Sequence, residues 1–187
     1  MMDPATTRER DVQADMPDMP RDRTDRRLFL AGLAATLIAG RHFFVTEAQA
    51  AFGPRVSVAK IDLRQAESYI SAVRANHGAG PVRMEGRLVE AARSHSMMMA
   101  RKGRIAHQFG PGTRFSARIR RAGDFGAAAE NVGAGYPSME SVMDGWLRSP
   151  GHRRNLLNKK LTHIGFAAAV NPASKYRTYW TLILARP

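Results

Sequence analysis

The stretch that decides the fold is Trp146-Leu147-Arg148-Ser149-Pro150-Gly151-His152-Arg153-Arg154-Asn155. A second block, Ala129-Glu130-Asn131-Val132-Gly133, precedes it, and Ile105-Ala106-His107 lies further upstream. These blocks hold two histidines, one carboxylate and several amide and hydroxyl groups. If folding brings His107, Glu130 and His152 together, they form a polar cleft suited to a divalent metal or a polar ligand.

The segments around these blocks predict helices first and a hairpin last. Apolar residues recur at helical spacing over residues 58–76 and 85–102, and shorter helices are expected at 115–121, 138–147 and 152–158. Ser149-Pro150-Gly151 predicts a break between the last two helices. Residues 126–135 suit an extended segment, while 164–170 and 179–184 are strand-like and are joined by a turn at 171–175. This order predicts an α+β domain in which helices cover a small antiparallel sheet.

The N-terminal 50 residues read as an export signal. Arg26-Arg27 precedes an apolar run over residues 28–40, which is too short to span a bilayer comfortably, and Ala48-Gln49-Ala50 is a small-x-small cleavage site. The arginine pair resembles a twin-arginine signal, although Asp25 and Ala31 depart from the usual pattern. The alternative is an uncleaved anchor. We therefore expect a signal at 1–50, a linker at 51–60, a domain at 61–187, and a periplasmic or secreted location.

The absence of cysteine and the net charge limit the kinds of site and the binding partners that this chain can have. The 187 residues contain no cysteine, which excludes disulfides, thiolate metal ligands and a cysteine nucleophile. Residues 51–187 hold 22 Lys and Arg against 8 Asp and Glu, a net charge of +14. Such a charge attracts polyanions, and beyond an inner membrane these are anionic membrane surfaces or envelope polymers. We expect no nucleic-acid partner, because aromatic residues do not interleave with the basic ones and the signal indicates export.

The candidate residues of the site differ in how strongly the sequence favours a functional role for each. Glu130 is a lone carboxylate in an almost uncharged segment, so it needs either a hydrogen-bonding partner or a cleft with a histidine opposite. His152 follows a Pro-Gly turn, and Asn155 could hydrogen-bond backbone in the same turn. His107 taken alone fits a surface loop equally well. His95 lies on the apolar face of its helix and reads as a core histidine.

The motifs together resemble the CAP superfamily, the cysteine-rich secretory, antigen 5 and pathogenesis-related group, in its bacterial SCP-like branch. Glu130-Asn131-Val132 matches the Glu-Asn-aliphatic motif of that family, and Trp146…Ser149-Pro150-Gly151-His152-Arg153-x-Asn155-Leu156-Leu157 matches a second motif. The likeness runs from about residue 66 to residue 184 and includes Leu161-Thr162-His163-Ile164-Gly165-Phe166 and Tyr179-Trp180.

The resemblance implies a three-layer α-β-α sandwich with a small central antiparallel sheet. It also implies a cleft lined by two histidines and two acidic residues, which His107, His152 and Glu130 match. We expect the cleft of this chain to comprise His107, Glu130, Ser149 and His152, with Asn131 and Asn155 in support. Eukaryotic members of the family that this chain resembles carry a second acidic residue three positions after the tryptophan. This chain has Ser149 at that position. A serine cannot supply that charge, so the four-residue arrangement lacks one partner here.

Two functions follow as hypotheses. The first is an exported binding module that holds a small polar or lipid ligand, or a metal, in the His/Glu cleft. The second is a metal-assisted, peptidase-like hydrolase in which His107 and His152 hold Zn²⁺ or another divalent cation and Glu130 is the general base. Zinc in catalytic sites normally has three protein ligands, so a site with two is unusual, and we prefer the first hypothesis.

Overall fold

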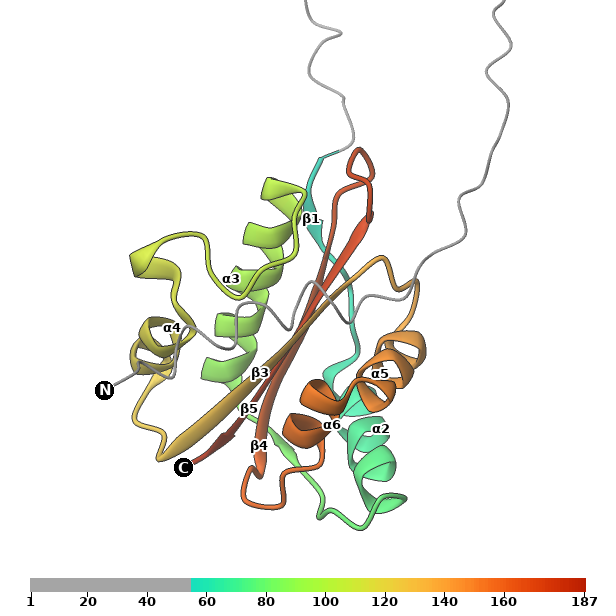
Figure 1. Ribbon diagram of the computed structural model, residues 1–187, viewed down its shortest axis with the longest axis vertical. Helices are drawn as coiled ribbons and strands as arrows, with labels where there is room; N and C mark the ends of the chain where they lie inside the picture. The colour runs from blue at the N-terminus through green and yellow to red at the C-terminus, as the bar shows by residue number, and fades with distance from the viewer. Residues whose placement is uncertain (1–54) are drawn as a thin grey trace, which may run out of the picture. The chain divides into compact units, whose positions relative to one another are not determined.

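A five-stranded sheet lies between two layers of helices in the computed structural model, which describes residues 55–187 (Figure 1). The predicted signal at 1–50 lies outside the described residues. Helices α3 and α4 cover one face of the sheet, and α2, α5 and α6 cover the other. The predicted α+β class and the three-layer α-β-α sandwich are confirmed. Within the described part of the chain, no helix combines the length and the apolar character needed to cross a bilayer.

The centre of the sheet is the predicted hairpin. Strand β4 (His163–Val170) pairs antiparallel with β5 (Thr178–Arg186), and β5 pairs antiparallel with β3 (Ala127–Ala134). Two short strands complete the sheet. β1 (Ser57–Val58) is antiparallel to β4, and β2 (Arg83–Met84) is parallel to it. The order β1-β4-β5-β3 leaves β3 at an edge.

One helical layer rests very closely on β4. Helix α3 (Gly86–Lys102) ends at Gly103, whose φ of 60° is the left-handed conformation that glycine adopts without strain. A Cβ atom on Gly165 would lie 2.1 Å from the backbone carbon and oxygen of Leu88, so the backbone of α3 occupies the space of the missing side chain. Helix α4 (Phe115–Ala122) packs beside α3.

The other layer builds the larger core. Helix α2 (Leu63–Ala75) begins at Asp62, whose carboxylate accepts two backbone N–H bonds. Helix α5 (Met139–Arg148) begins with a capping box between Ser138 and Ser141. Trp146 of α5 meets Phe166 edge-on, and Phe166 stacks on Trp180 at a centroid distance of 5.5 Å.

Alternation along the strands assigns each side chain to a layer. In β5, Trp180, Leu182 and Leu184 join the core under α2 and α5, while Ile183 and Ala185 pack under α3 and α4. In β3, Val132 and Ala134 pack with Met99 of α3. Even-numbered residues of β3 therefore face α3 and α4, and odd-numbered residues face α5 and α6.

The structure corrects two details of the sequence prediction. Pro150 does not break the chain but is the first residue of helix α6 (Pro150–Leu156), where its fixed φ suits a helix and its missing N–H costs nothing. Residues 57–58, inside the predicted linker 51–60, form β1, and Ala59 donates its N–H to the oxygen of Ala168. The sheet thus starts before residue 61. Two-residue strands carry no readable period, so sequence alone does not reveal them.

Candidate functional site

Glu130 is the charged centre of the site. Its side chain projects from β3 toward α3 and α4 and is only 2% exposed. One carboxylate oxygen lies 2.8 Å from Nδ1 of His107, and both oxygens accept hydrogen bonds from the guanidinium of Arg118, at 2.5 and 3.0 Å. The lone carboxylate that the sequence singled out is therefore buried with two partners.

These partners keep Glu130 ionised. Burial on its own would raise the pKa of this carboxyl, because it penalises the charged form. The hydrogen bonds from His107 and Arg118, together with the charges of His95 and Arg118, outweigh that penalty and lower the pKa of Glu130 to about 2. A carboxylate with this pKa accepts hydrogen bonds at neutral pH and does not hold a proton there.

His107 is oriented by this carboxylate. It lies between α3 and the short 3₁₀ helix Pro111–Thr113, and its side chain is 30% exposed. Because ionised Glu130 can only accept, Nδ1 of His107 must carry the hydrogen of the 2.8 Å bond. In the neutral ring this leaves Nε2 as a lone-pair acceptor. The pair thus holds one imidazole in a defined tautomer.

Arg118 is the member of the site that sequence reasoning missed. It is 4% exposed and, besides Glu130, it donates to the backbone oxygens of His107 (2.9 Å) and Thr113 (3.1 Å). Arg118 therefore ties the loop that carries His107 to β3. The available signal was its position in α4, where Phe115, Ile119 and Ala122 form an apolar face and Arg118 falls on the same face.

His95 of α3 is fully buried, as expected for a core histidine. Its Nε2 lies 2.8 Å from the oxygen of Ala106 and 3.9 Å from Glu130, so Nε2 carries the hydrogen that the carbonyl accepts. Burial lowers the pKa of His95 to about 4, despite the attraction of Glu130. Its Nδ1 is buried without a hydrogen-bond partner among the described residues. His95 is consequently neutral at neutral pH.

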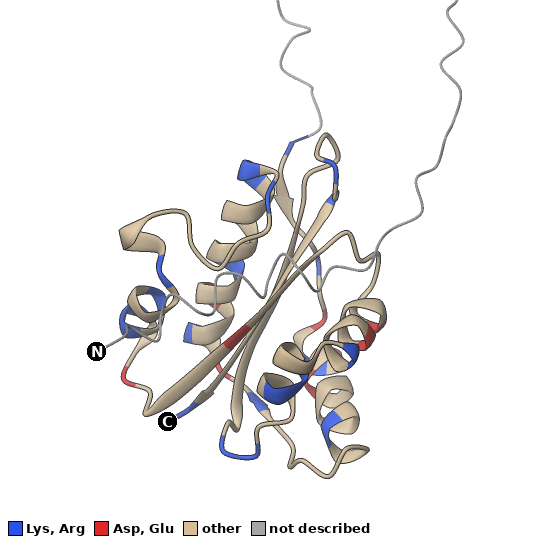
Figure 2. Cartoon of the chain, in the orientation of Figure 1, with Lys and Arg blue, Asp and Glu red and all other residues tan. Residues whose placement is uncertain are grey.

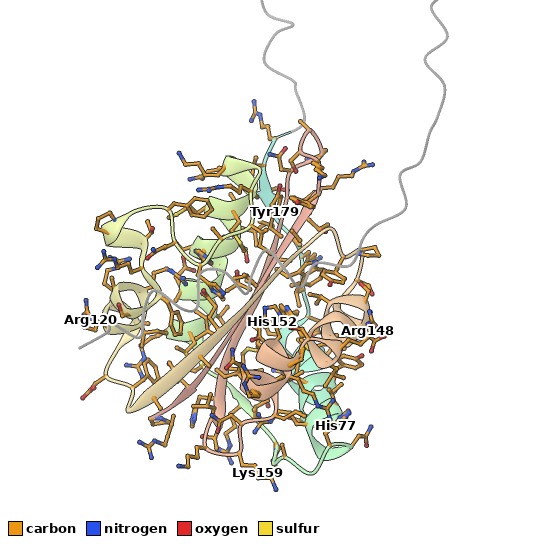
Figure 3. All side chains as sticks on the ribbon, viewed as in Figure 1. His77, Arg120, Arg148, His152, Lys159 and Tyr179 are labelled. Carbon is orange, nitrogen blue, oxygen red and sulfur yellow. The ribbon has the colours of Figure 1, made fainter. Side chains whose placement is uncertain are left out.

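The remaining predicted residues gather on the other side of β3. Asn131 is fully buried and donates its side-chain amide to the backbone oxygen of His152, at 3.0 Å. Asn155 donates to the side-chain oxygen of Asn131, also at 3.0 Å. His152 points its Nδ1 at the hydroxyl of Ser149, 2.8 Å away, and Figure 3 shows it where α6 lies beside β3.

This second group also protects the edge of the sheet. Asn155 donates to the backbone oxygen of Glu130 (3.2 Å), and the indole N–H of Trp146 donates to that of Val132 (3.1 Å). These oxygens belong to the side of β3 that no described strand pairs. An unpaired strand edge invites pairing with another chain, so α5 and α6 close it with side-chain donors.

The six predicted residues therefore form two groups joined through one strand. His107 and Glu130 are in direct contact on the α3 and α4 side. Asn131, Ser149, His152 and Asn155 are joined on the α6 side. Because Glu130 and Asn131 are consecutive in β3, their side chains point to opposite faces. The backbone oxygen of Glu130, held by Asn155, connects the two groups.

The donor set does not fit a catalytic zinc ion. No group of three or more His, Asp or Glu side chains in the described part of the chain is arranged to hold a metal. Both oxygens of Glu130 are engaged by Arg118, which brings a fixed positive charge to the carboxylate, whereas Nε2 of His107 keeps its lone pair. A dication at Glu130 would have to displace that guanidinium from a buried position.

Comparison with known proteins gives a consistent picture. A family model described as the cysteine-rich secretory protein family, CAP, matches residues 67–184. The chain is 33% identical over 96 residues to the uncharacterized protein YkwD of Bacillus subtilis, which is 51% of this chain and 37% of that protein. The match thus spans well under half of that relative's length.

Two solved structures share the fold. An extracellular protein containing an SCP domain from Bacillus anthracis superposes with a TM-score of 0.57 at 25% identity, over 66% of this chain and 40% of its own. An outer surface protein from Borrelia burgdorferi superposes with a TM-score of 0.59 at 20% identity, over 70% of this chain and 98% of its own. Both are, by name, proteins of the cell exterior.

Proposed function

The chain belongs to the cysteine-rich secretory protein (CAP) family, and from that membership and the contacts of Glu130 we propose that it is an exported envelope protein whose His107–Glu130 pair binds a small polar ligand. The observation that carries this proposal is the 2.8 Å bond between His107 and Glu130. It fixes one partly exposed imidazole with Nε2 available to a ligand, while Arg118 compensates the charge of the carboxylate.

The chemistry of the pair favours a ligand with a hydroxyl, amide or acidic group. In the neutral ring, Nε2 of His107 accepts a hydrogen bond. In the protonated ring it donates one, and Glu130 balances the charge of the imidazolium. The pair can therefore hold a polar group in either protonation state without a metal.

The alternative, a metal-assisted hydrolase using His107, His152 and Glu130, has less support. It requires several converging metal ligands, and no group of three or more His, Asp or Glu side chains among residues 55–187 is arranged to hold a metal. A metal-free hydrolase would need a nucleophile, and the one hydroxyl of the site that contacts an imidazole, Ser149, contacts His152 and not the His107–Glu130 pair. The geometry favours binding.

Export and envelope recruitment belong to the same proposal. The predicted signal and the exterior location of the two structural neighbours support them. Leu63, at 37%, is the most exposed large hydrophobic side chain in the described part of the chain. With so little apolar surface, adhesion to the envelope would be electrostatic and would weaken as salt rises.

The test is to identify what the purified protein retains. Wild type and His107→Ala would be isolated after export and examined by native mass spectrometry together with metal analysis. His77→Ala is the matched control, because His77 is exposed and its ring contacts the helix carbonyl of Val73, remote from the site. We expect a small molecule that is retained by wild type and control and lost from His107→Ala. Equal retention by all three would contradict the proposal.

A further inference from the structure

The C-terminal part of the chain carries positive charge without compensation. From Gly145 to Pro187 the sequence has no Asp or Glu. Within this part, four exposed cations follow one another over α6 and the loop after it, and we call them the basic face: Arg153, Arg154, Lys159 and Lys160. None of them forms an ion pair with an acidic residue among residues 55–187. Arg87 and Arg93 do have carboxylate partners, whereas exposed Arg120 of α4 has none among the same residues.

A buried arginine shapes this face from inside. Arg74 of α2 is fully buried, and its guanidinium donates to the backbone oxygens of Leu156 (2.6 Å), Asn158 (3.3 Å) and Leu161 (3.1 Å). These carbonyls belong to the end of α6 and to the following loop. The C-terminal end of a helix carries partial negative charge on such carbonyls, which would repel an anion.

Arg74 offsets this repulsion, because its guanidinium binds the carbonyl oxygens. With the carbonyl oxygens turned inward to the guanidinium, the exposed side of the loop is dominated by Lys159 and Lys160. Nε of Arg74 also donates to the oxygen of Gly80 at 2.8 Å, which ties the segment after α2 to the same guanidinium. The loop is therefore held in one conformation in which its cations face solvent.

We propose that the basic face is the docking surface for a polyanion of the cell envelope, a polymer that bears phosphate or carboxylate groups along its length. The inference rests on the proposed envelope location. Each exposed charge contributes little by itself, but several cations that engage successive anionic groups of one chain act together. Arginine adds bidentate geometry for such groups, and lysine adds point charges.

The surface favours a polymer over a bilayer. The basic face includes no exposed apolar side chain that could enter a membrane, and the exposed Leu63 belongs to the first turn of α2. Figure 2 shows Lys and Arg along α6 and in the loop before β4, and Figure 3 places Lys159 at the end of the molecule away from Tyr179. The face starts immediately after His152, so a bound polymer would pass beside the α6 half of the candidate site.

The opposite end of the sandwich offers a matched control. Arg101, Lys102, Lys175 and Arg177 are also exposed, and Asn171 ties their two segments together through a 2.7 Å bond to the oxygen of Ala100. The eight residues of β4 separate these cations from the basic face. At about 3.3 Å per residue the separation is roughly 25 Å.

The test compares two fourfold charge reversals in the full chain. R153E/R154E/K159E/K160E alters the basic face, and R101E/K102E/K175E/R177E makes the same change in net charge at the other end. Binding of fluorescently labelled inorganic polyphosphate is followed by anisotropy at several salt concentrations, and circular dichroism verifies folding. The corresponding glutamine variants replace any charge-reversed protein that does not fold.

We expect the basic-face variant to lose at least about tenfold in affinity, with a shallower dependence on salt, and the control to lose less than about threefold. Equal losses in both variants, or no binding of polyphosphate by wild type, would overturn the inference. So would adsorption of wild type to phosphatidylglycerol vesicles without binding to the polymer. His107→Ala should bind polyphosphate normally, so a failure of the proposed ligand site is distinguished from a failure of the face. Retention of the protein in the cytoplasm on fractionation would contradict the envelope role itself.

Discussion

Arg118 and Glu130 form a buried, two-bond ion pair between α4 and β3. Nη1 and Nη2 of the arginine lie 2.5 and 3.0 Å from the two carboxylate oxygens, and the side chains are 4% and 2% exposed. The same guanidinium holds the oxygens of His107 and Thr113. This pair therefore sets both the charge of the site and the position of its accessible histidine.

Loss of Arg118 should be costly. Arg118→Met leaves Glu130 buried with one partner fewer, and breaking a buried pair in this way destabilises proteins by about 3–5 kcal/mol. Arg118→Met combined with Glu130→Gln should cost clearly less than the sum of the single changes, because no buried charge remains unpaired. Urea unfolding of the four proteins measures this coupling. Strictly additive effects would show that the pair is not coupled in solution.

Stability should fall on acidification in two steps. Burial keeps the pKa of His95 at about 4, below its ordinary 6.5. Between these values the unfolded chain binds a proton that the folded protein does not, so stability present above pH 6.5 is lost as the pH falls toward 4. The shift corresponds to about 3 kcal/mol. Glu130, with its pKa lowered from 4.5 to about 2, extends the loss to lower pH.

His95→Gln tests the first step. The variant should show a flatter dependence of unfolding free energy on pH between 6.5 and 4, whereas His77→Gln, at an exposed position, should keep the wild-type slope. Urea unfolding at a series of pH values makes the comparison. An unchanged slope in His95→Gln would show that His95 is not held neutral by the fold.

Gly165 should tolerate no side chain. A Cβ atom there would meet the backbone of Leu88 at 2.1 Å, so Gly165→Ala must push α3 away from β4. Overpacking of this kind costs about 1–3 kcal/mol, and more where backbone must move. Gly80→Ala is the control, since its Cβ would meet no atom within 4 Å. Equal stability of the two variants by urea unfolding would place α3 further from the sheet than described.

Zinc binding by the wild-type protein should be weak. Calorimetry at about pH 7.5, where an unperturbed histidine is neutral, should give no stoichiometric binding to wild type. Binding with a stoichiometry of one that His107→Ala and His152→Ala both abolish would instead support the metal-assisted alternative.

The sequence predicted the elements and the main residues of the site better than their mutual arrangement. Helical periods located α2 and α3, the start signal at Ser138 located α5, and the motif around Glu130 pointed to a partnered carboxylate. A sequence motif does not show which face of a strand each of its side chains occupies. Glu130 and Asn131 read as one motif, yet a period of two directs their side chains to different layers.

Arg118 shows a second limit of the sequence. In a chain with 29 Lys and Arg, one more arginine in a short basic helix attracts no attention. Only the position of Arg118 on the apolar face of α4 distinguishes it, and its contacts with Glu130, His107 and Thr113 join segments that are distant in sequence. Arg74 is similar, because three of its partners, Leu156, Asn158 and Leu161, lie more than eighty residues away.

The tautomer of His107 is the most direct measurement on the proposed binding pair. Nitrogen-15 NMR of the histidine side chains, at a pH where the ring is neutral, should show the hydrogen of His107 on Nδ1 and a lone pair on Nε2. Neutral His107 with its hydrogen on Nε2 would mean that Glu130 does not hold the ring, and the proposed site would not exist in that form.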